Sequence, residues 1–312
     1  MAHRAPGKSF RKGMSLFEIM DLFPDDAAAE RWFTETRWPK GPHCPYCGST
    51  DILTGAAHKT MPYRCRERGC RKRFSVRTKS AMEASNIGYR KWAIAFYLFA
   101  TSLKGVSSMK LHRDLEITQK SAWFMAHRIR EAWQEHGCPF DGPVEVDETY
   151  VGGREKNKHA RKKKRLGRGG VGKAIVAGAR DRATNRVTAE TIPDTTRLTL
   201  SNYIAAHVAP EAMVYTDEHK GYSGLPRHES VVHGRGEYVN GDCHTQGIES
   251  LWALLKRGIM GTYHQISPKH LDRYVNEFAG RHNDRDSDTI DMMAHMAKGM
   301  VGKRLRYEDL IA

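Results

Sequence analysis

Residues 144–153 read VEVDETYVGG, and this stretch decides which fold the chain is expected to adopt. Its short apolar run is typical of a buried strand, and Asp147 closes that run. Successive side chains of a strand point to opposite faces, which puts Glu145 and Asp147 on one face and Glu148 on the other. The stretch therefore predicts a strand that presents an acidic residue near its end.

Two further acidic residues stand in equally recognisable settings. Asp217 closes a second strand-like run within MVYTDEHKGY, residues 213–222. Glu249 lies near the start of a helical pattern, HTQGIESLWALLKRG, at residues 244–258. Lys256 follows Glu249 by two helical turns and so lies on the same helix face. We expect Asp147 and Asp217 side by side on adjacent strands, with Glu249 approaching from a helix packed across the sheet.

Carboxylates on separate elements suit a pair of Mg²⁺ or Mn²⁺ ions that cut a phosphodiester bond, because such ions clamp the attacking and leaving oxygens. Mg²⁺ prefers oxygen ligands and takes only a few carboxylates from a protein. A cation at Lys256, or at Arg257 in its place, is suited to hold a phosphate. Alternatives stay open: Glu145 or Glu148 is the ligand on the first strand, or Glu249 is an ordinary first-turn helix acid.

The pattern around these acids predicts an α/β fold. Strand-like runs occupy residues 144–150, 173–180, 186–191, 213–217 and a short stretch near 230–232, and helical patterns occupy 198–208, 247–257 and 268–281. Strands, a helix, a strand and then helices around one sheet are typical of a mixed sheet of the ribonuclease H type.

Four of the six cysteines form two close pairs. Cys44 and Cys47 have two residues between them, Cys65 and Cys70 have four, and 17 residues separate the pairs. Four thiolates at such spacing suit tetrahedral Zn²⁺ in a zinc ribbon, with four unligated core cysteines as the alternative. A small ribbon buries little surface, so we expect this zinc to be structural.

A helical segment follows the ribbon, and its last two helices are separated by a short turn. Thr118 is the expected N-cap of the final helix. Short helices joined by a tight turn indicate a helix-turn-helix whose last helix offers Gln119, Lys120, Arg128 and Arg130 outward. A simple helical spacer is the alternative.

The chain is strongly basic, with 51 Lys and Arg against 36 Asp and Glu and a net charge of +15. Such an excess favours a polyanionic partner, because phosphate contacts release counterions. Residues 154–169 are the densest basic run, with nine Lys or Arg and one Glu, and a solubilising loop is the alternative to DNA contact there. The expected DNA-binding residues are Arg71, Lys72, Arg73, Lys120, Arg128, Lys162, Lys163, Lys164, Arg165 and Arg257.

Several long stretches are similar, in the same order, to one protein family. They are residues 23–49, 63–80, 144–159, 214–222 and 244–283. On these stretches the chain resembles bacterial insertion-sequence transposases with an N-terminal zinc ribbon and a DDE catalytic domain, an ISXO2-like group related to the Merlin elements. The resemblance implies a ribonuclease H-like fold, Asp147, Asp217 and Glu249 as the catalytic triad, and Lys256 in the companion basic position. Some relatives have Asn where Glu249 stands, so the acid favours activity.

Such an enzyme would bind the inverted-repeat ends of its own insertion sequence, hydrolyse DNA strands and join the 3′-hydroxyl ends to target DNA. The resemblance implies that both steps use the same pair of Mg²⁺ (or Mn²⁺) ions. Double-stranded DNA is the expected partner, and concerted action on two ends implies a homodimer or larger assembly. Two rivals remain: a catalytically inactive or domesticated DNA-binding relative, and a structure-specific nuclease of the same fold. A zinc-ribbon transcription or replication factor leaves the acidic motifs unexplained.

The expected organisation has five parts. They are an N-terminal helical segment (1–40), the zinc ribbon (41–80), a helical DNA-binding segment (81–138), a catalytic domain (139–285) with a basic loop (154–170), and a C-terminal tail (286–312). No apolar run of about 18 residues predicts a membrane span. No apolar segment follows the basic N-terminus, so secretion is not indicated, and we expect a cytoplasmic, nucleoid-associated bacterial protein.

Overall fold

A computed structural model describes residues 3–4, 10–134, 137, 139–153, 159, 161, 163, 170, 172–232, 239 and 241–312. The chain divides into two compact units, each described here by itself. One comprises Met1–Glu135 with Arg285–Ala312, and the other comprises His136–Asp284.

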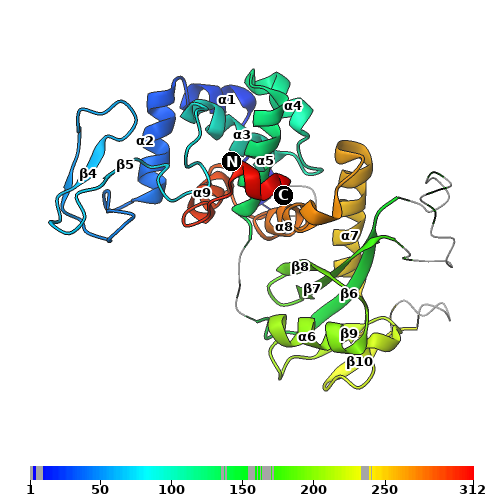
Figure 1. Ribbon diagram of the computed structural model, residues 1–312. Helices are drawn as coiled ribbons and strands as arrows, with labels where there is room; N and C mark the ends of the chain where they lie inside the picture. Colours follow the sequence, from blue (N-terminus) through cyan, green and yellow to red (C-terminus); the bar gives the residue numbers. More distant parts are fainter. Residues whose placement is uncertain are drawn as a thin grey trace. The chain divides into compact units, whose positions relative to one another are not determined.

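The second unit is built on a mixed five-stranded sheet (Figure 1). The strands are β6 (Val144–Val151), β7 (Ala174–Asp181), β8 (Val187–Ile192), β9 (Val214–Thr216) and β10 (His228–Ser230), in the order β10-β9-β6-β7-β8. The first three strands pair antiparallel, whereas β9 runs parallel to both β6 and β10. The expected α/β content and mixed sheet are confirmed, and the strands begin and end within two residues of the expected positions.

Helices cover both faces of this sheet, because side chains along its strands point alternately to one face and the other and are apolar on both. α6 (Arg197–His207) shares a buried cluster with Val144 and Val146 of β6. α7 (Gln246–Gly258) and α8 (Leu271–Asn283) pack on the opposite face, against a cluster that includes Val176 of β7. Short helical turns complete the unit: η3 (Lys220–Tyr222), the π-helical η5 (Ile259–Tyr263) and η6 (Pro268–His270).

The first unit is helical, with one large core. Its helices are α1 (Leu16–Leu22), α2 (Asp26–Arg37), α3 (Tyr89–Thr101), α4 (Ser108–Leu115), α5 (Gln119–Glu131), α9 (Thr289–Gly299) and α10 (Tyr307–Ile311). Asp25 caps α2 by accepting from the backbone N of Ala28 at 2.7 Å. The segment expected to be a C-terminal tail carries α9, whose Met292, Met293 and Met296 are buried in this core.

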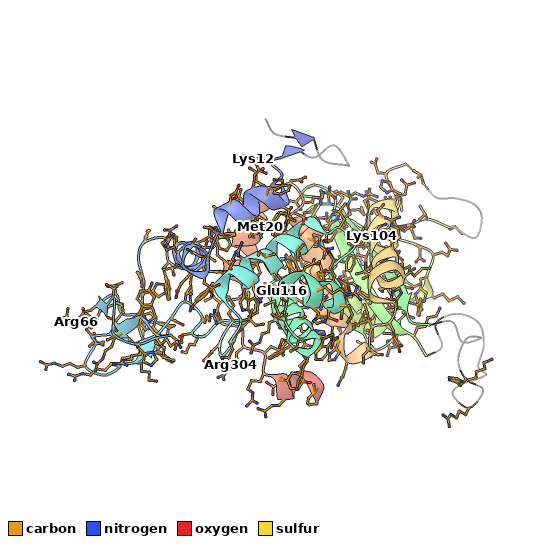
Figure 2. All side chains as sticks on the ribbon, turned by 90° about the horizontal axis from the view of Figure 1, so that it is seen from above. Lys12, Met20, Arg66, Lys104, Glu116 and Arg304 are labelled. Carbon is orange, nitrogen blue, oxygen red and sulfur yellow. The ribbon has the colours of Figure 1, made fainter. Side chains whose placement is uncertain are left out.

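The pair α4–α5 has the expected short turn. Glu116, labelled in Figure 2, ends α4 in the left-handed conformation with φ 49°. Thr118 caps α5 by accepting from the backbone N of Ser121 at 3.2 Å, as predicted. The expected outward position of Arg128 and Arg130 is wrong, because they are only 7% and 2% exposed. The C-terminal half of α5 packs inside the unit, which leaves only its first turn open to solvent.

The cysteine segment of the first unit forms a small antiparallel sheet. Its strands are β3 (Ile52–Leu53), β4 (Tyr63–Cys65) and β5 (Arg73–Phe74), and a separate two-stranded pair near the N-terminus joins β1 (His3–Arg4) to β2 (Phe10–Arg11). Trp38, which ends α2, packs edge-on against the rings of Tyr63 and Phe74. Arg66 follows β4 and projects to solvent (Figure 2).

Among the described residues, no helix is long and apolar enough to cross a membrane.

Candidate active site and metal centre

The parallel pairing of β6 with β9 brings two of the predicted acids together. Val144 pairs with Val214 and Glu145 pairs with Tyr215. Asp217 directly follows the end of β9, and continuing the same register by two residues leads from these pairs to Asp147 and Asp217. The two aspartates lie close enough for the charge of Asp217 to raise the pKa of Asp147.

A tryptophan on α7 holds the first of these aspartates. The indole Nε1 of Trp252 donates to Oδ2 of Asp147 at 2.9 Å. Gly178 lies opposite Asp147 on β7, and a Cβ there would lie 2.5 Å from the Trp252 ring. A glycine at this position is thus what allows α7 to approach the sheet closely enough for the hydrogen bond to form.

Charge and burial raise the pKa of Asp147 to about 7. Burial is the largest cause, and the negative charges of Glu148 and Asp217 add to it. The pKa of Glu148 is also raised, mainly by burial and further by Asp217, against a lowering effect of the hydrogen bond from Tyr222. Like charges gathered in a partly buried site disfavour ionisation unless a cation accompanies them.

Glu148 lies on the opposite face of β6, as the alternation predicts. It accepts from the Tyr222 hydroxyl at 2.7 Å, and its Oε1 lies 4.0 Å from Nε2 of His219. The backbone N of His219 donates to Oδ1 of Asp217 at 3.0 Å. Glu148 is therefore tied to the turn that carries Asp217.

Glu249 stands in the first turn of α7, exposed, and accepts from the hydroxyl of Thr245 at 2.9 Å. Lys256 and Arg257 are exposed in the last turn of the same helix. Within the part of the chain that the structure describes, only the four cysteines form a group of ligands compact enough to hold an ion. The structure thus pairs Asp147 with Asp217 and leaves Glu249 outside such a group.

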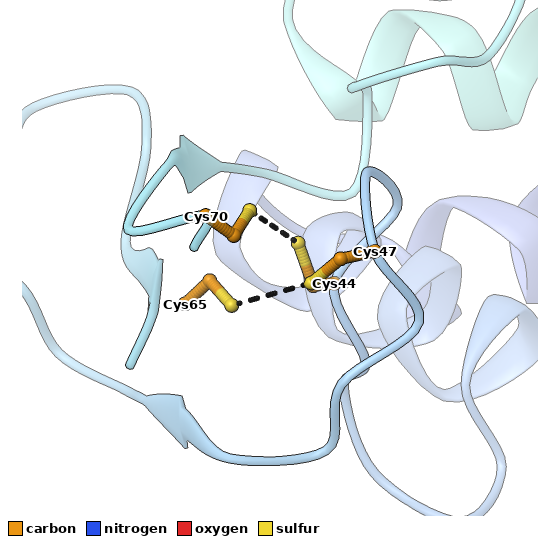
Figure 3. A group of neighbouring side chains, drawn as sticks. All are labelled: Cys44, Cys47, Cys65 and Cys70. Atoms are coloured by element: carbon orange, nitrogen blue, oxygen red, sulfur yellow. Dashed lines mark hydrogen bonds between the residues drawn. The ribbon is translucent and has the colours of Figure 1, made fainter. Parts of the chain in front are cut away.

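Cys44, Cys47, Cys65 and Cys70 converge on one point of the ribbon (Figure 3). Their sulfur atoms all lie within 4.8 Å of one another, with 3.7 Å between Cys44 and Cys70 and 3.6 Å between Cys47 and Cys65. Zn–S bonds of about 2.3 Å in a tetrahedron place sulfurs about 3.8 Å apart, which matches this spacing. All four are free thiols, so the cluster has the geometry of a Cys₄ metal site.

The expected DNA-binding residues divide into three sets. Exposed on the described surface are Arg71, Lys72, Arg73, Lys120, Lys163 and Arg257. Arg128 is buried: its Nε donates to the carbonyl of Leu305 at 3.4 Å, and burial lowers its pKa to about 10. Lys162, Lys164 and Arg165 lie outside the described residues. Arg128 therefore packs inside its unit, which contradicts the expected outward position, and DNA contact by this residue stays an untested prediction.

These features define a two-part protein, with a cysteine ribbon in one unit and a paired-acid α/β domain in the other. Residues 139–283 match the ISXO2-like transposase domain, and residues 24–73 match the transposase zinc-ribbon domain. Both matched domains are domains of transposases, and they lie in the order that the sequence resemblance implies. It is 27% identical over 270 residues to an uncharacterized protein in the transposable element ISH50 of Halobacterium salinarum, with 82% of this chain and 90% of that protein covered.

Proposed function

We propose that this chain is a DNA transposase that binds the inverted-repeat ends of its insertion sequence, hydrolyses DNA strands there and joins the 3′-hydroxyl ends to target DNA. The observation that carries the proposal is that Asp147 lies near enough to Asp217 to feel its charge and is hydrogen-bonded to Trp252 of the helix that bears Glu249. The matches to an ISXO2-like transposase domain and to a transposase zinc-ribbon domain support it independently.

Asp147, Asp217 and Glu249 are the proposed ligands of two Mg²⁺ or Mn²⁺ ions. The site fits such ions because its donors are carboxylate oxygens, which Mg²⁺ prefers. The raised pKa of Asp147 also reflects burial and negative charge that a cation would offset. When bound, the ions would stabilise the attacking and leaving oxygens of an in-line phosphoryl transfer.

The residues around the acids have separate proposed roles. The Trp252 indole fixes the orientation of the Asp147 carboxylate, and the His219 backbone N fixes that of Asp217. Lys256 lies two helical turns beyond Glu249 on the same helix face, which supports a role for its ammonium group in holding a DNA phosphate, with Arg257 as the neighbouring cation. The sheet order, with three antiparallel strands and a parallel β9, supports a ribonuclease H-like fold for this domain.

The other unit is proposed to recognise DNA. Zn²⁺ bound by the four cysteines would stabilise the ribbon, whose Arg71, Lys72 and Arg73 would contact the DNA backbone. Lys120 is exposed in the first turn of α5, which supports a role in DNA contact, because the N-terminal residues of a recognition helix contact base edges. Lys163, and the neighbouring basic residues of the same loop, would hold target or flanking DNA. Concerted action on two ends favours a homodimer or larger assembly in the cytoplasm, at the nucleoid.

A joining assay tests the proposal. The zinc-loaded protein is incubated with labelled DNA from the ends that flank its own gene, a plasmid target and Mg²⁺ or Mn²⁺. We expect metal-dependent joined product, and none with Asp217→Asn. Cleavage without joining supports the structure-specific nuclease, and DNA binding without either reaction supports the inactive relative.

A further inference from the structure

Glu145 is a second acidic residue on the face of β6 that carries Asp147, and its side chain is fully buried. Its Oε1 accepts from Nη1 of Arg180 at 2.8 Å and from Nε of Arg182 at 2.9 Å. Its Oε2 accepts from the backbone N of Ile248 at 2.9 Å. Ile248 belongs to the first turn of α7 and directly precedes Glu249.

This contact replaces a missing local helix cap. The first backbone N–H groups of a helix have no partner inside the helix, and the side chain of the N-cap residue commonly accepts from one of them. Thr245 holds the N-cap position of α7 but makes no such bond, and its hydroxyl donates to Glu249 instead. Glu145, 103 residues away in sequence, accepts from the third of these groups in its place.

The two arginines reinforce the attachment of α7 to the sheet. The Arg182 guanidinium also donates to the carbonyl oxygens of Asp242 and His244, in the chain that leads into α7. At Gly247, an added Cβ would lie 2.0 Å from Nη1 of Arg180, so the missing side chain leaves room for the Arg180–Glu145 pair. A buried carboxylate needs this compensation, since an unpaired charge there would be strongly destabilising.

We propose that Glu145 is a positioning residue, which fixes the start of α7 on β6 and thereby sets Glu249 relative to Asp147. The inference rests on the proposed function, because it assumes that Glu249 and Asp147 serve one metal site. The link is short: Glu145 and Asp147 are two residues apart on one strand face, and Ile248 adjoins Glu249. Outer residues that orient metal ligands typically change metal affinity 10- to 100-fold when replaced.

Mn²⁺ binding, measured by electron paramagnetic resonance on the zinc-loaded full chain, tests the inference without relying on activity. Glu145→Gln should bind Mn²⁺ about 10- to 100-fold more weakly than the unchanged chain, through loss of the ligand arrangement. Glu145→Asp keeps the buried charge and shortens its reach, so it should fold and show the same direction of change. Asp272→Asn is the matched control, because Asp272 joins the first turn of α8 to Thr191 of β8.

Asp147→Asn separates the two hypotheses. If it loses Mn²⁺ binding while both folded Glu145 variants bind Mn²⁺ like the unchanged chain, the positioning role is overturned and the metal site stands. If Asp147→Asn binds Mn²⁺ as tightly as the unchanged chain does, both the proposed metal site and the positioning role of Glu145 are contradicted. Weakened Mn²⁺ binding in the Glu145 variants, with Asp272→Asn unchanged, supports the inference even if DNA cleavage is absent.

Discussion

At the scale of single residues, Asp147 has the most informative surroundings. It accepts a hydrogen bond from Trp252, and burial and the charges of its acidic neighbours Glu148 and Asp217 raise its pKa to about 7. An aspartate whose only role was to end a strand would be expected in a turn exposed to solvent. The contacts of Asp147 therefore favour a role as a cation ligand over a role as a strand-ending residue.

The raised pKa of Asp147 predicts how the metal-free protein responds to pH. The unfolded chain releases this proton near pH 3.8 and the folded chain near pH 7. Folding therefore takes up a proton at Asp147 between these values, and the contribution of Asp147 to stability falls as pH rises from about 4 to 7. Asp147→Asn should relieve this loss and raise the free energy of unfolding at pH 8, by at most about 4 kcal/mol.

Thermal unfolding of the zinc-loaded protein in buffer prepared free of Mg²⁺ and Mn²⁺ measures this effect. The variant should gain stability over the unchanged chain at pH 8 and gain little at pH 4. A variant that is equally or less stable than the unchanged chain at pH 8 would contradict the raised pKa. Addition of Mg²⁺ at pH 8 should stabilise the unchanged chain more than the variant.

At the scale of elements, the position of α7 depends on one glycine. Gly178→Ala places a Cβ 2.5 Å from the Trp252 ring and 3.0 Å from Ile248, so α7 must shift away from β7. Overpacking of this kind costs about 1–3 kcal/mol. We expect a comparable fall in the denaturant-derived free energy of unfolding, together with reduced DNA cleavage.

Gly261→Ala is the control for this substitution, because no atom lies within 4 Å of a Cβ at that position. Its stability and cleavage should match those of the unchanged chain within error. Equal behaviour of the two alanine variants would show that the close approach of α7 has no bearing on the site.

The exposed and buried basic residues of α5 should respond differently to substitution. Lys120→Ala should weaken binding to end DNA and lower the free energy of unfolding by no more than about 1 kcal/mol, because Lys120 is exposed and its Nζ contacts the Tyr307 ring, 4.3 Å from the centroid. Arg128→Ala should lower the free energy of unfolding by about 1–3 kcal/mol, because it removes a buried donor to Leu305. Fluorescence anisotropy at two salt concentrations and denaturant titration measure the two effects, and a binding loss confined to folded Arg128→Ala would contradict the assignment.

The elements themselves were largely predictable from the sequence. The strand around Asp147 and the helix around Glu249 appear where the apolar patterns placed them, because periodicity reports burial directly. Arg128 and Arg130 were not predictable, since their burial depends on residues near Leu305, at the far end of the chain. The hydrogen bonds of Trp252 and Glu145 to partners more than 100 residues away also depend on tertiary packing. The sequence did contain one sign that α7 approaches the sheet closely, because Gly178 is a single glycine inside a predicted strand.

At the scale of the whole molecule, the two proposed metal sites belong to two separately compact units. The cysteine site needs only local turns of the ribbon, and its four ligands were identifiable from spacing alone. The proposed acidic site combines residues from β6, the end of β9 and α7, so it depends on strand pairing and on the position of α7 against the sheet. Its three acids do not form a ligand group within the described residues. The central claim is that these acids nevertheless hold metal ions together.

The most direct test is anomalous diffraction from crystals of the zinc-loaded protein grown with Mn²⁺ and end DNA. We predict manganese peaks within ligand distance of the Asp147 and Asp217 carboxylates, with Glu249 reaching one of the ions. Mn²⁺ found only elsewhere, with Asp147 still bonded to Trp252 and no ion beside Asp217, would contradict the proposed site.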